Sequence, residues 1–280
     1  MTHLEYDWES PVWRHWLREL SNGHTLIRYD ERGNGLSDRD AENLSFDSWI
    51  SDLESVVDAA GLDRFPLFGI SQGCAVAITY TVRHPERVTR LVLYGGFAQG
   101  VVARARNPAQ LAEVKMIMEG IPLGWGYDNP AFRQFFAARF LPEGTPEQMR
   151  WFSELQRLTT SPEIGARLLT TASTIDVTDV LPHVKVPVLV LHATGDAVAA
   201  FGEGRKLAAL LPNARFVPLE SRNHILLEQE PAWVRFVNEL RSFLAEDERE
   251  NHSSSATRDL QPTAAAPPHQ SQSSRRTTRR

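Results

Sequence analysis

Three polar residues in well-separated segments have the side chains that a nucleophilic catalyst needs. Ser71 lies in "LFGISQGCA", Asp196 closes "VLVLHATGD", and His224 lies in "RNHILLEQEP". A serine hydroxyl is a weak nucleophile until a histidine accepts its proton and a carboxylate orients that histidine. The order Ser, Asp, His therefore predicts Ser71 as nucleophile, Asp196 as the acid of the triad and His224 as the base.

Each of these residues also has an ordinary structural interpretation. Ser71 could simply cap a helix in a tight turn. Asp196 could be a turn residue, and His224 could be a surface histidine. The three together, each placed after an apolar run, favour the catalytic interpretation.

The residues around Ser71 predict a sharp turn between a strand and a helix. An apolar run precedes the turn and a run of small residues follows it. In such a turn the serine has strained backbone angles, and we expect side chains at Gly69 or Gly73 to collide with the strand and the helix. The backbone amide of Gln72 would then point to where an oxyanion forms during catalysis.

The hydrophobic pattern along the chain alternates between helices and strands, which predicts an α/β fold with a parallel sheet. From 97 to 180 the alternation stops and the composition favours helices throughout. We therefore divide the chain into a core part (1–96), a helical cap insertion (97–180), a second core part (181–246) and a disordered tail (247–280). The expected helices are 11–20, 46–61, 72–83, 204–211 and 231–246, and the expected strands are 24–30, 65–69, 88–96, 186–193 and 215–219.

The three motifs resemble those of the α/β-hydrolase fold superfamily and occur in the same order. "LIRYDERGNGLSD" also resembles the segment after the fourth strand of that fold, and "HLEYDWESPVWRHWLREL" resembles hydrolase domains fused to bacterial transcriptional regulators or adenylate cyclases. The resemblance implies a mostly parallel sheet with helices on both faces, a helical cap over the pocket, and the triad Ser71, Asp196 and His224. It implies no metal and no organic cofactor, and a regulatory domain fused to, or partnering, some relatives.

Two parts of that fold are not found in the sequence. The superfamily's second oxyanion donor comes from a loop after the third strand, often marked His-Gly, and no such pair precedes the helix expected at 11–20. The opening strands of the sheet are missing as well. We expect either that the natural start lies further upstream or that this chain is a fragment.

Composition excludes several other classes of protein. The net charge is −5, and the last thirty residues carry +4 from five Arg and one Asp, so the rest of the chain carries −9 (−5 − 4). Nucleic acid is therefore not an expected partner. A single cysteine, Cys74, excludes an internal disulfide and a multi-cysteine metal site. No apolar run is long enough to cross a membrane and no signal peptide is visible, which predicts a cytoplasmic protein.

Four further features have a structural explanation that we weigh against a functional one. His192 is expected to be a packed histidine, Cys74 a buried core residue, and Asp30 a loop residue, although Asp30 is the second choice for the acid of the triad. The aromatic residues Trp125, Tyr127, Phe132, Phe135 and Phe136 are expected either to line an acyl pocket or to form the core of the cap.

The predicted function is hydrolysis of a small ester or amide through an acyl-enzyme intermediate. A serine in the turn argues against epoxide hydrolysis and dehalogenation, which use a carboxylate nucleophile in this superfamily. The alternative is a ligand-sensing or vestigial module, in which the pocket binds a small molecule without converting it.

Overall fold

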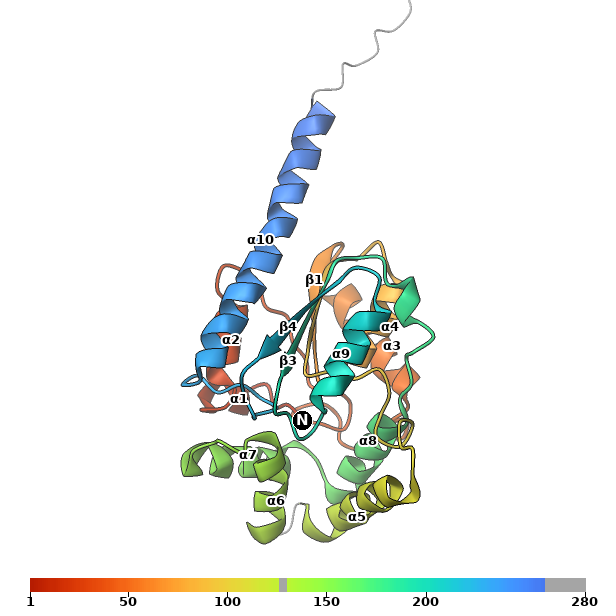
Figure 1. Ribbon diagram of the computed structural model, residues 1–280, viewed down its shortest axis with the longest axis vertical. Coiled ribbons are helices and arrows are strands. Elements are labelled where there is room, and N and C mark those ends of the chain that lie inside the picture. The colour runs from red at the N-terminus through yellow and green to blue at the C-terminus, as the bar shows by residue number, and fades with distance from the viewer. Residues whose placement is uncertain (126–129, 260–280) are drawn as a thin grey trace, which may run out of the picture.

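The computed structural model describes residues 1–125 and 130–259, which form one sheet and its flanking helices (Figure 1). The strands are β1 (Phe65–Ile70), β2 (Val88–Tyr94), β3 (Val188–Ala193) and β4 (Ala214–Leu219). The helices are α1 (Tyr6–Glu9), α2 (Arg14–Leu20), α3 (Phe46–Ala59), α4 (Gly73–Arg83), α5 (Pro108–Gly124), α6 (Pro130–Phe140), α7 (Pro146–Thr159), α8 (Pro162–Thr174), α9 (Phe201–Leu210) and α10 (Pro231–Asp259), with a 3₁₀ turn at Leu181–His183.

The four strands pair in chain order, β1-β2-β3-β4, and every pair is parallel, as the sequence predicted. Ile70 pairs with Tyr94, and Tyr94 pairs with Leu191. This register brings the carboxyl ends of the strands to one edge of the sheet. The loops that carry polar residues after β1, β3 and β4 therefore begin close together.

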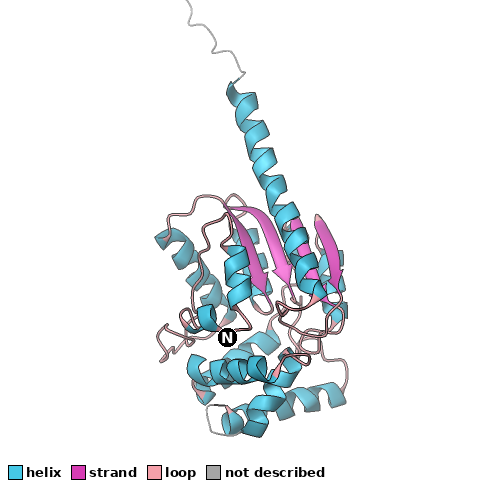
Figure 2. Ribbon diagram, turned by 90° about the vertical axis from the view of Figure 1, so that its left-hand side faces the viewer, coloured by secondary structure: helices cyan, strands magenta, loops and turns pink. Residues whose placement is uncertain are grey.

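Both faces of the sheet are buried, which explains the continuous apolar runs of its central strands. Leu91 and Leu93 of β2 face a core shared with α3, α4 and α9, whereas Val92 and Tyr94 face a core shared with α2 and α10. Figure 2 shows the sheet between these helices. The parallel sheet with helices on both faces that was expected from the sequence is confirmed.

Helices α5 to α8 lie between β2 and β3 in the chain and gather beyond the carboxyl ends of the strands (Figure 1). Three of them begin with a proline preceded by a capping side chain: Asn107, Thr145 and Ser161 accept hydrogen bonds from amides of the first turn. The sequence predicted helices throughout this segment, and an isolated bridge between Gln99 and Asp176 is its one ladder contact among the described residues. The exact division of the chain into parts stays a prediction.

The strand expected at 24–30 is wrong, because these residues form no strand in the structure. Residues 24–29 line the same cavity as residues of β1, whose outer edge has no paired strand among the described residues. A strand exists only with a hydrogen-bonded neighbour, so the apolar sequence alone is not sufficient.

The disordered tail expected from residue 247 is wrong in its first part, because α10 continues to Asp259. Residues 246–250 are Glu, Asp, Glu, Arg and Glu, and most of these extend a helix at little cost. The rest of the predicted tail, 260–280, lies outside the described residues. No helix in the described part of the chain is both long and apolar enough to span a membrane.

A buried histidine ties α2 to the loop after β4. The Leu226 carbonyl accepts hydrogen bonds from His15 Nε2 at 3.0 Å and from Trp16 Nε1 at 2.9 Å. The His15 ring also packs edge-on against Trp233. Burial lowers the pKa of His15 to about 4, so the ring is neutral in the folded protein at neutral pH.

We predict that this histidine makes the protein less stable in mild acid. Its pKa is lower in the folded state than in the unfolded state, so between about pH 6.5 and 4 the unfolded chain binds the extra proton and stability falls as the pH falls. Between pH 7 and pH 5 this residue should cost about 2 kcal/mol. Urea unfolding at both pH values should show a drop smaller by that amount in His15→Gln than in the wild type. Equal drops in the two proteins would contradict the assignment.

Candidate active site

The turn after β1 holds Ser71 in the strained conformation that the sequence predicted. Ser71 has a φ of +55°, the only positive φ of a non-glycine residue in the described chain. Its amide donates to the Tyr94 carbonyl at 2.8 Å, and its carbonyl accepts from the Cys74 amide at 3.0 Å. These bonds fix the turn between the end of β1 and the start of α4. Left-handed backbone at a serine costs free energy, and such strain is concentrated at functional sites.

Only one of the two flanking glycines has the predicted steric role. A Cβ at Gly69 would lie 2.8 Å from the Gly73 carbonyl oxygen and 2.9 Å from Cys74 Cα, so the helix can pack there only against glycine. A Cβ at Gly73 would meet nothing within 4 Å outside the backbone of its own helix. The predicted clash at Gly73 is therefore wrong, because this position begins α4 and faces open space.

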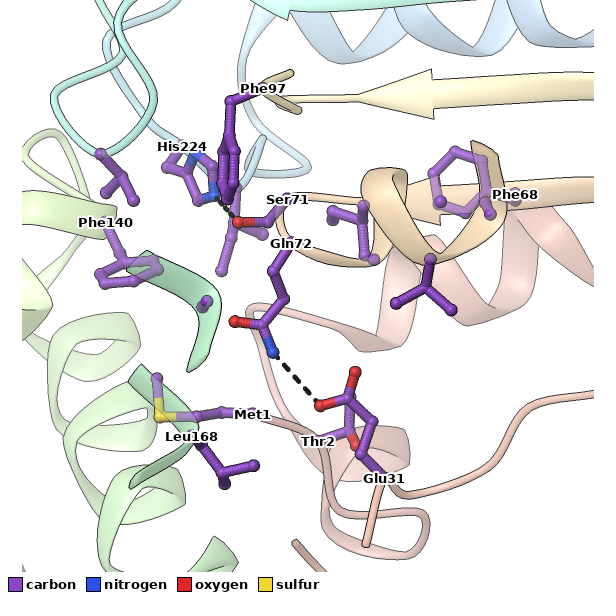
Figure 3. A pocket seen from close by; sticks show the side chains of 18 of the residues that line it. Met1, Thr2, Glu31, Phe68, Ser71, Gln72, Phe97, Phe140, Leu168 and His224 are labelled. Carbon is purple, nitrogen blue, oxygen red and sulfur yellow. Dashed lines mark hydrogen bonds between the residues drawn. The ribbon is translucent and has the colours of Figure 1, made fainter. Parts of the chain in front are cut away.

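Ser71, His224 and Asp196 lie together in one hydrogen-bonded chain (Figure 3 shows its Ser71 and His224 members). His224 Nε2 is 3.0 Å from Ser71 Oγ, and His224 Nδ1 is 2.6 Å from Asp196 Oδ2. Because a carboxylate only accepts hydrogen bonds, Nδ1 carries the proton and the lone pair of Nε2 faces the serine. The tertiary structure brings together three residues separated by up to 153 positions in the chain.

The Asp196 carboxylate is buried, and both of its oxygens accept hydrogen bonds. Its second oxygen, Oδ1, accepts from the amides of Val198 at 2.7 Å and Ala199 at 3.0 Å. Burial alone would raise the pKa of Asp196, but the charge of His224 and these hydrogen bonds together hold it below the usual value. The aspartate is therefore ionised at neutral pH and can stabilise a positive charge on His224.

The loop that carries His224 is held from several directions. The His224 amide donates to the Phe140 carbonyl of α6 at 2.8 Å, and the Phe140 ring meets the imidazole edge-on. Glu230 accepts from the side chain of Asn223 at 2.8 Å and from the amide of Leu227 at 2.7 Å. Sequence analysis missed Glu230 and Asn223. Their only signal was their place in a loop rich in polar residues.

The Gln72 amide is available as a donor at this site. No hydrogen bond from the Gln72 N–H to another protein group is found among the described residues. Its place directly after Ser71 and before α4 is consistent with the predicted oxyanion donor. The Gln72 side chain turns instead to Glu31, where its Nε2 donates to Oε2 at 3.2 Å (Figure 3).

The secondary candidates have the structural roles that were expected. His192 is fully buried, and its Nε2 lies 2.8 Å from the Ala199 carbonyl. Cys74 is buried, with its thiol against the carbonyls of Gly69 and Tyr94. Asp30 is not the acid of the triad, because its carboxylate accepts instead from the amides of Leu4 and Leu36.

Ser71 and His224 line a cavity of about 1380 Å³ between the sheet and α5 to α8. Trp125 and Phe136 are buried in a small core with Ile121 and also line this cavity, so both interpretations of the aromatic residues hold. Phe135 is exposed instead, and Tyr127 lies outside the described residues. Among the described residues, no group of three or more His, Cys, Asp or Glu side chains is placed to hold a metal ion.

Comparison with known proteins identifies the family. The alpha/beta hydrolase fold model matches residues 8–231, which is most of the chain, so this protein belongs to that family. The chain is 29% identical over 215 residues to the AB hydrolase superfamily protein YisY of Bacillus subtilis, covering 74% of this chain and 78% of that protein. It is 28% identical over 236 residues to a non-heme chloroperoxidase of Streptomyces lividans, covering 80% and 82%.

Solved structures show the same fold. An esterase from Exiguobacterium antarcticum superposes with a TM-score of 0.71 at 23% identity and covers 86% of each chain. The esterase RhEst1 from Rhodococcus has a TM-score of 0.67 at 24% identity, covering 82% of this chain and 84% of that one. At these identities the likeness shows the fold.

We predict that the two glycines of the turn tolerate alanine very differently. Gly69→Ala should lower the free energy of unfolding by about 1–3 kcal/mol, because the added methyl group overlaps backbone atoms of α4 that cannot move independently. Gly73→Ala makes the same chemical change in open space and should shift it by less than about 0.5 kcal/mol. Urea unfolding of both variants measures the difference. Equal losses would show that the packing at Gly69 is not as close as the structure has it.

Proposed function

We propose that this protein is a serine hydrolase that cleaves a small ester or amide. The observation that carries the proposal is the chain of two hydrogen bonds from Ser71 through His224 to Asp196, at 3.0 and 2.6 Å. It is supported by the strained turn at Ser71 and by a cavity that opens onto the serine hydroxyl.

The chemistry follows from the direction of these hydrogen bonds. His224 Nε2 takes the proton from Ser71 Oγ as the oxygen attacks the carbonyl carbon of the substrate. The oxyanion that forms is stabilised by the Gln72 amide and the amino end of α4. His224 then gives the proton to the leaving group, and an acyl-enzyme remains on Ser71 until water, activated by the same histidine, releases it. Asp196 holds the imidazole and stabilises its positive charge in both halves of the reaction.

The relatives and structural neighbours include proteins named as esterases and hydrolases, which is consistent with this class of reaction. For this chain the carboxylic ester specificity is part of the proposal. A second oxyanion donor, strands preceding residue 1, a regulatory partner domain and a cytoplasmic location stay predictions from sequence.

The alternative, a module that binds a small molecule without converting it, would use the same cavity. It differs in one measurable property, because only a working triad activates the Ser71 hydroxyl. A test of activation therefore separates the two candidates without knowledge of the natural substrate.

We predict that a fluorophosphonate adds once to the wild-type protein and not to Ser71→Ala, as measured by intact mass. Such probes phosphonylate an activated serine, whereas an ordinary hydroxyl does not react. His224→Ala should slow the labelling by at least about 10³-fold, because the serine loses its base.

Ser55→Ala is the matched control, since it removes an exposed hydroxyl of α3 that bonds only to the Ser51 carbonyl. This variant should label like the wild type. A folded wild-type protein that takes no adduct would refute the hydrolase proposal and favour the binding module.

A further inference from the structure

The cavity is mostly apolar, but part of its lining carries polar groups that the triad does not use. Two cationic side chains that also line it are already paired, Arg28 with Asp7 and Arg104 with Glu203. Glu31, Asn34, Gln72 and Thr160 belong to this lining. Figure 3 shows Glu31 and Gln72 turned toward each other, with Phe97 and Phe140 on the side of Ser71 and His224. We propose that these four residues, Glu31, Asn34, Gln72 and Thr160, here called the polar wall, bind a hydrogen-bond-donating cationic group, such as a primary ammonium, at one end of the substrate. The proposal rests on the hydrolase function proposed above and names its substrate class.

A tight turn aims Glu31 and Asn34 at the cavity. The Asn34 amide donates to the Glu31 carbonyl at 2.8 Å, which closes the turn. Arg32, between them, points away and donates to Asp52 at 2.7 Å. The Glu31 carboxylate reaches the side chain of Gln72, the residue after Ser71. The polar wall therefore begins at Gln72, directly after Ser71, and continues to Glu31, toward which the Gln72 side chain turns (Figure 3).

Two members of the polar wall are deeply buried and lack a partner. Asn34 and Thr160 are each 2% exposed, and neither Asn34 Oδ1 nor Thr160 Oγ1 has a hydrogen-bond partner among the described residues. The two chain segments that carry them are in contact, since the Gly35 amide donates to the Thr159 carbonyl at 2.7 Å. A buried acceptor left unpaired costs about 1–3 kcal/mol, which a donor on a bound ligand would recover.

The negative charge of Glu31 favours a ligand whose hydrogen-bond donor is positively charged. No Lys, Arg or His side chain of the described chain forms an ion pair with Glu31, which is half-buried. The pKa of Glu31 is raised by burial, against the opposing effects of the α-amino group of Met1 and of the Gln72 hydrogen bond. A ligand ammonium would supply the positive charge that this carboxylate lacks among the side chains, and a carboxylate at the same end of a substrate would be repelled.

The test compares two pairs of esters that differ only in the terminal group. Ethyl 6-aminohexanoate and ethyl heptanoate place an ammonium or a methyl group at the end of the acyl chain, and 6-aminohexyl acetate and heptyl acetate do the same on the alcohol side. Hydrolysis is followed by pH-stat. In at least one pair we expect the wild type to favour the amine, and Glu31→Gln to lower that preference in kcat/KM by at least about tenfold.

Two further variants distinguish a specific effect of the polar wall on amine preference from a general loss of stability or activity. Thr160→Val removes an unpartnered hydroxyl and should weaken the amine preference while leaving the urea midpoint unchanged or higher. Glu42→Gln makes the same change as Glu31→Gln at an exposed loop position and should leave the preference unchanged. Equal use of amine and alkyl esters by the wild type, or a preference unaffected by Glu31→Gln, would overturn the proposal.

Binding to Ser71→Ala keeps this test independent of turnover. Calorimetry should show 6-aminohexanamide binding more tightly than heptanamide, with the difference lost when Glu31→Gln is added. If that difference is found but no ester is hydrolysed and no fluorophosphonate adduct forms, the polar wall stands and the hydrolase proposal fails. If esters are hydrolysed without any amine preference, the hydrolase proposal stands and the polar wall fails.

Discussion

The arrangement of this protein depends on the common register of four parallel strands. Because Ile70, Tyr94 and Leu191 pair across the sheet, the strands end at one edge, and the loops beyond them start within reach of each other. The hydrogen bond from the Ser71 amide to the Tyr94 carbonyl extends that register by one residue into the turn. The position of Ser71 is thus set by the pairing of β1 with β2, which its turn continues.

The rest of the structure fixes the two other partners. Asp196 is held by the amides of its own loop, and His224 by the α6 carbonyl of Phe140 on one side. On the other side, Trp16 and His15 bind the carbonyl of Leu226, two residues beyond the base. Helix α2, near the amino end of the chain, and helix α6, in the insertion, therefore both help to place the His224 imidazole.

The cavity combines this hydrogen-bonded chain with an uneven distribution of polarity. Near Ser71 it is lined by aromatic side chains such as Phe97 and Phe140, whereas the polar wall carries a carboxylate and two buried groups without hydrogen-bond partners among the described residues. Proteins rarely leave buried polar atoms unpaired unless a ligand or water pairs with them. The residues that would select a substrate thus lie partly in the turn after residue 30, and not only in the helical insertion to which the sequence pointed.

The sequence by itself determined the fold class, the strands β1 to β4 and the helical segment between β2 and β3, because these depend on local pattern and on the order of motifs. It also pointed to Ser71, Asp196 and His224, which the structure joins by hydrogen bonds and which we propose as the triad. It failed at residues 24–30, where an apolar strand-like run has no partner to pair with, and at Gly73, where local crowding was expected but the position faces open space. The tertiary structure alone decided that Glu31 faces the cavity while Arg32 turns away, and that Glu230 supports the loop of His224. These roles depend on contacts between residues that are far apart in the chain, so the local sequence pattern does not predict them.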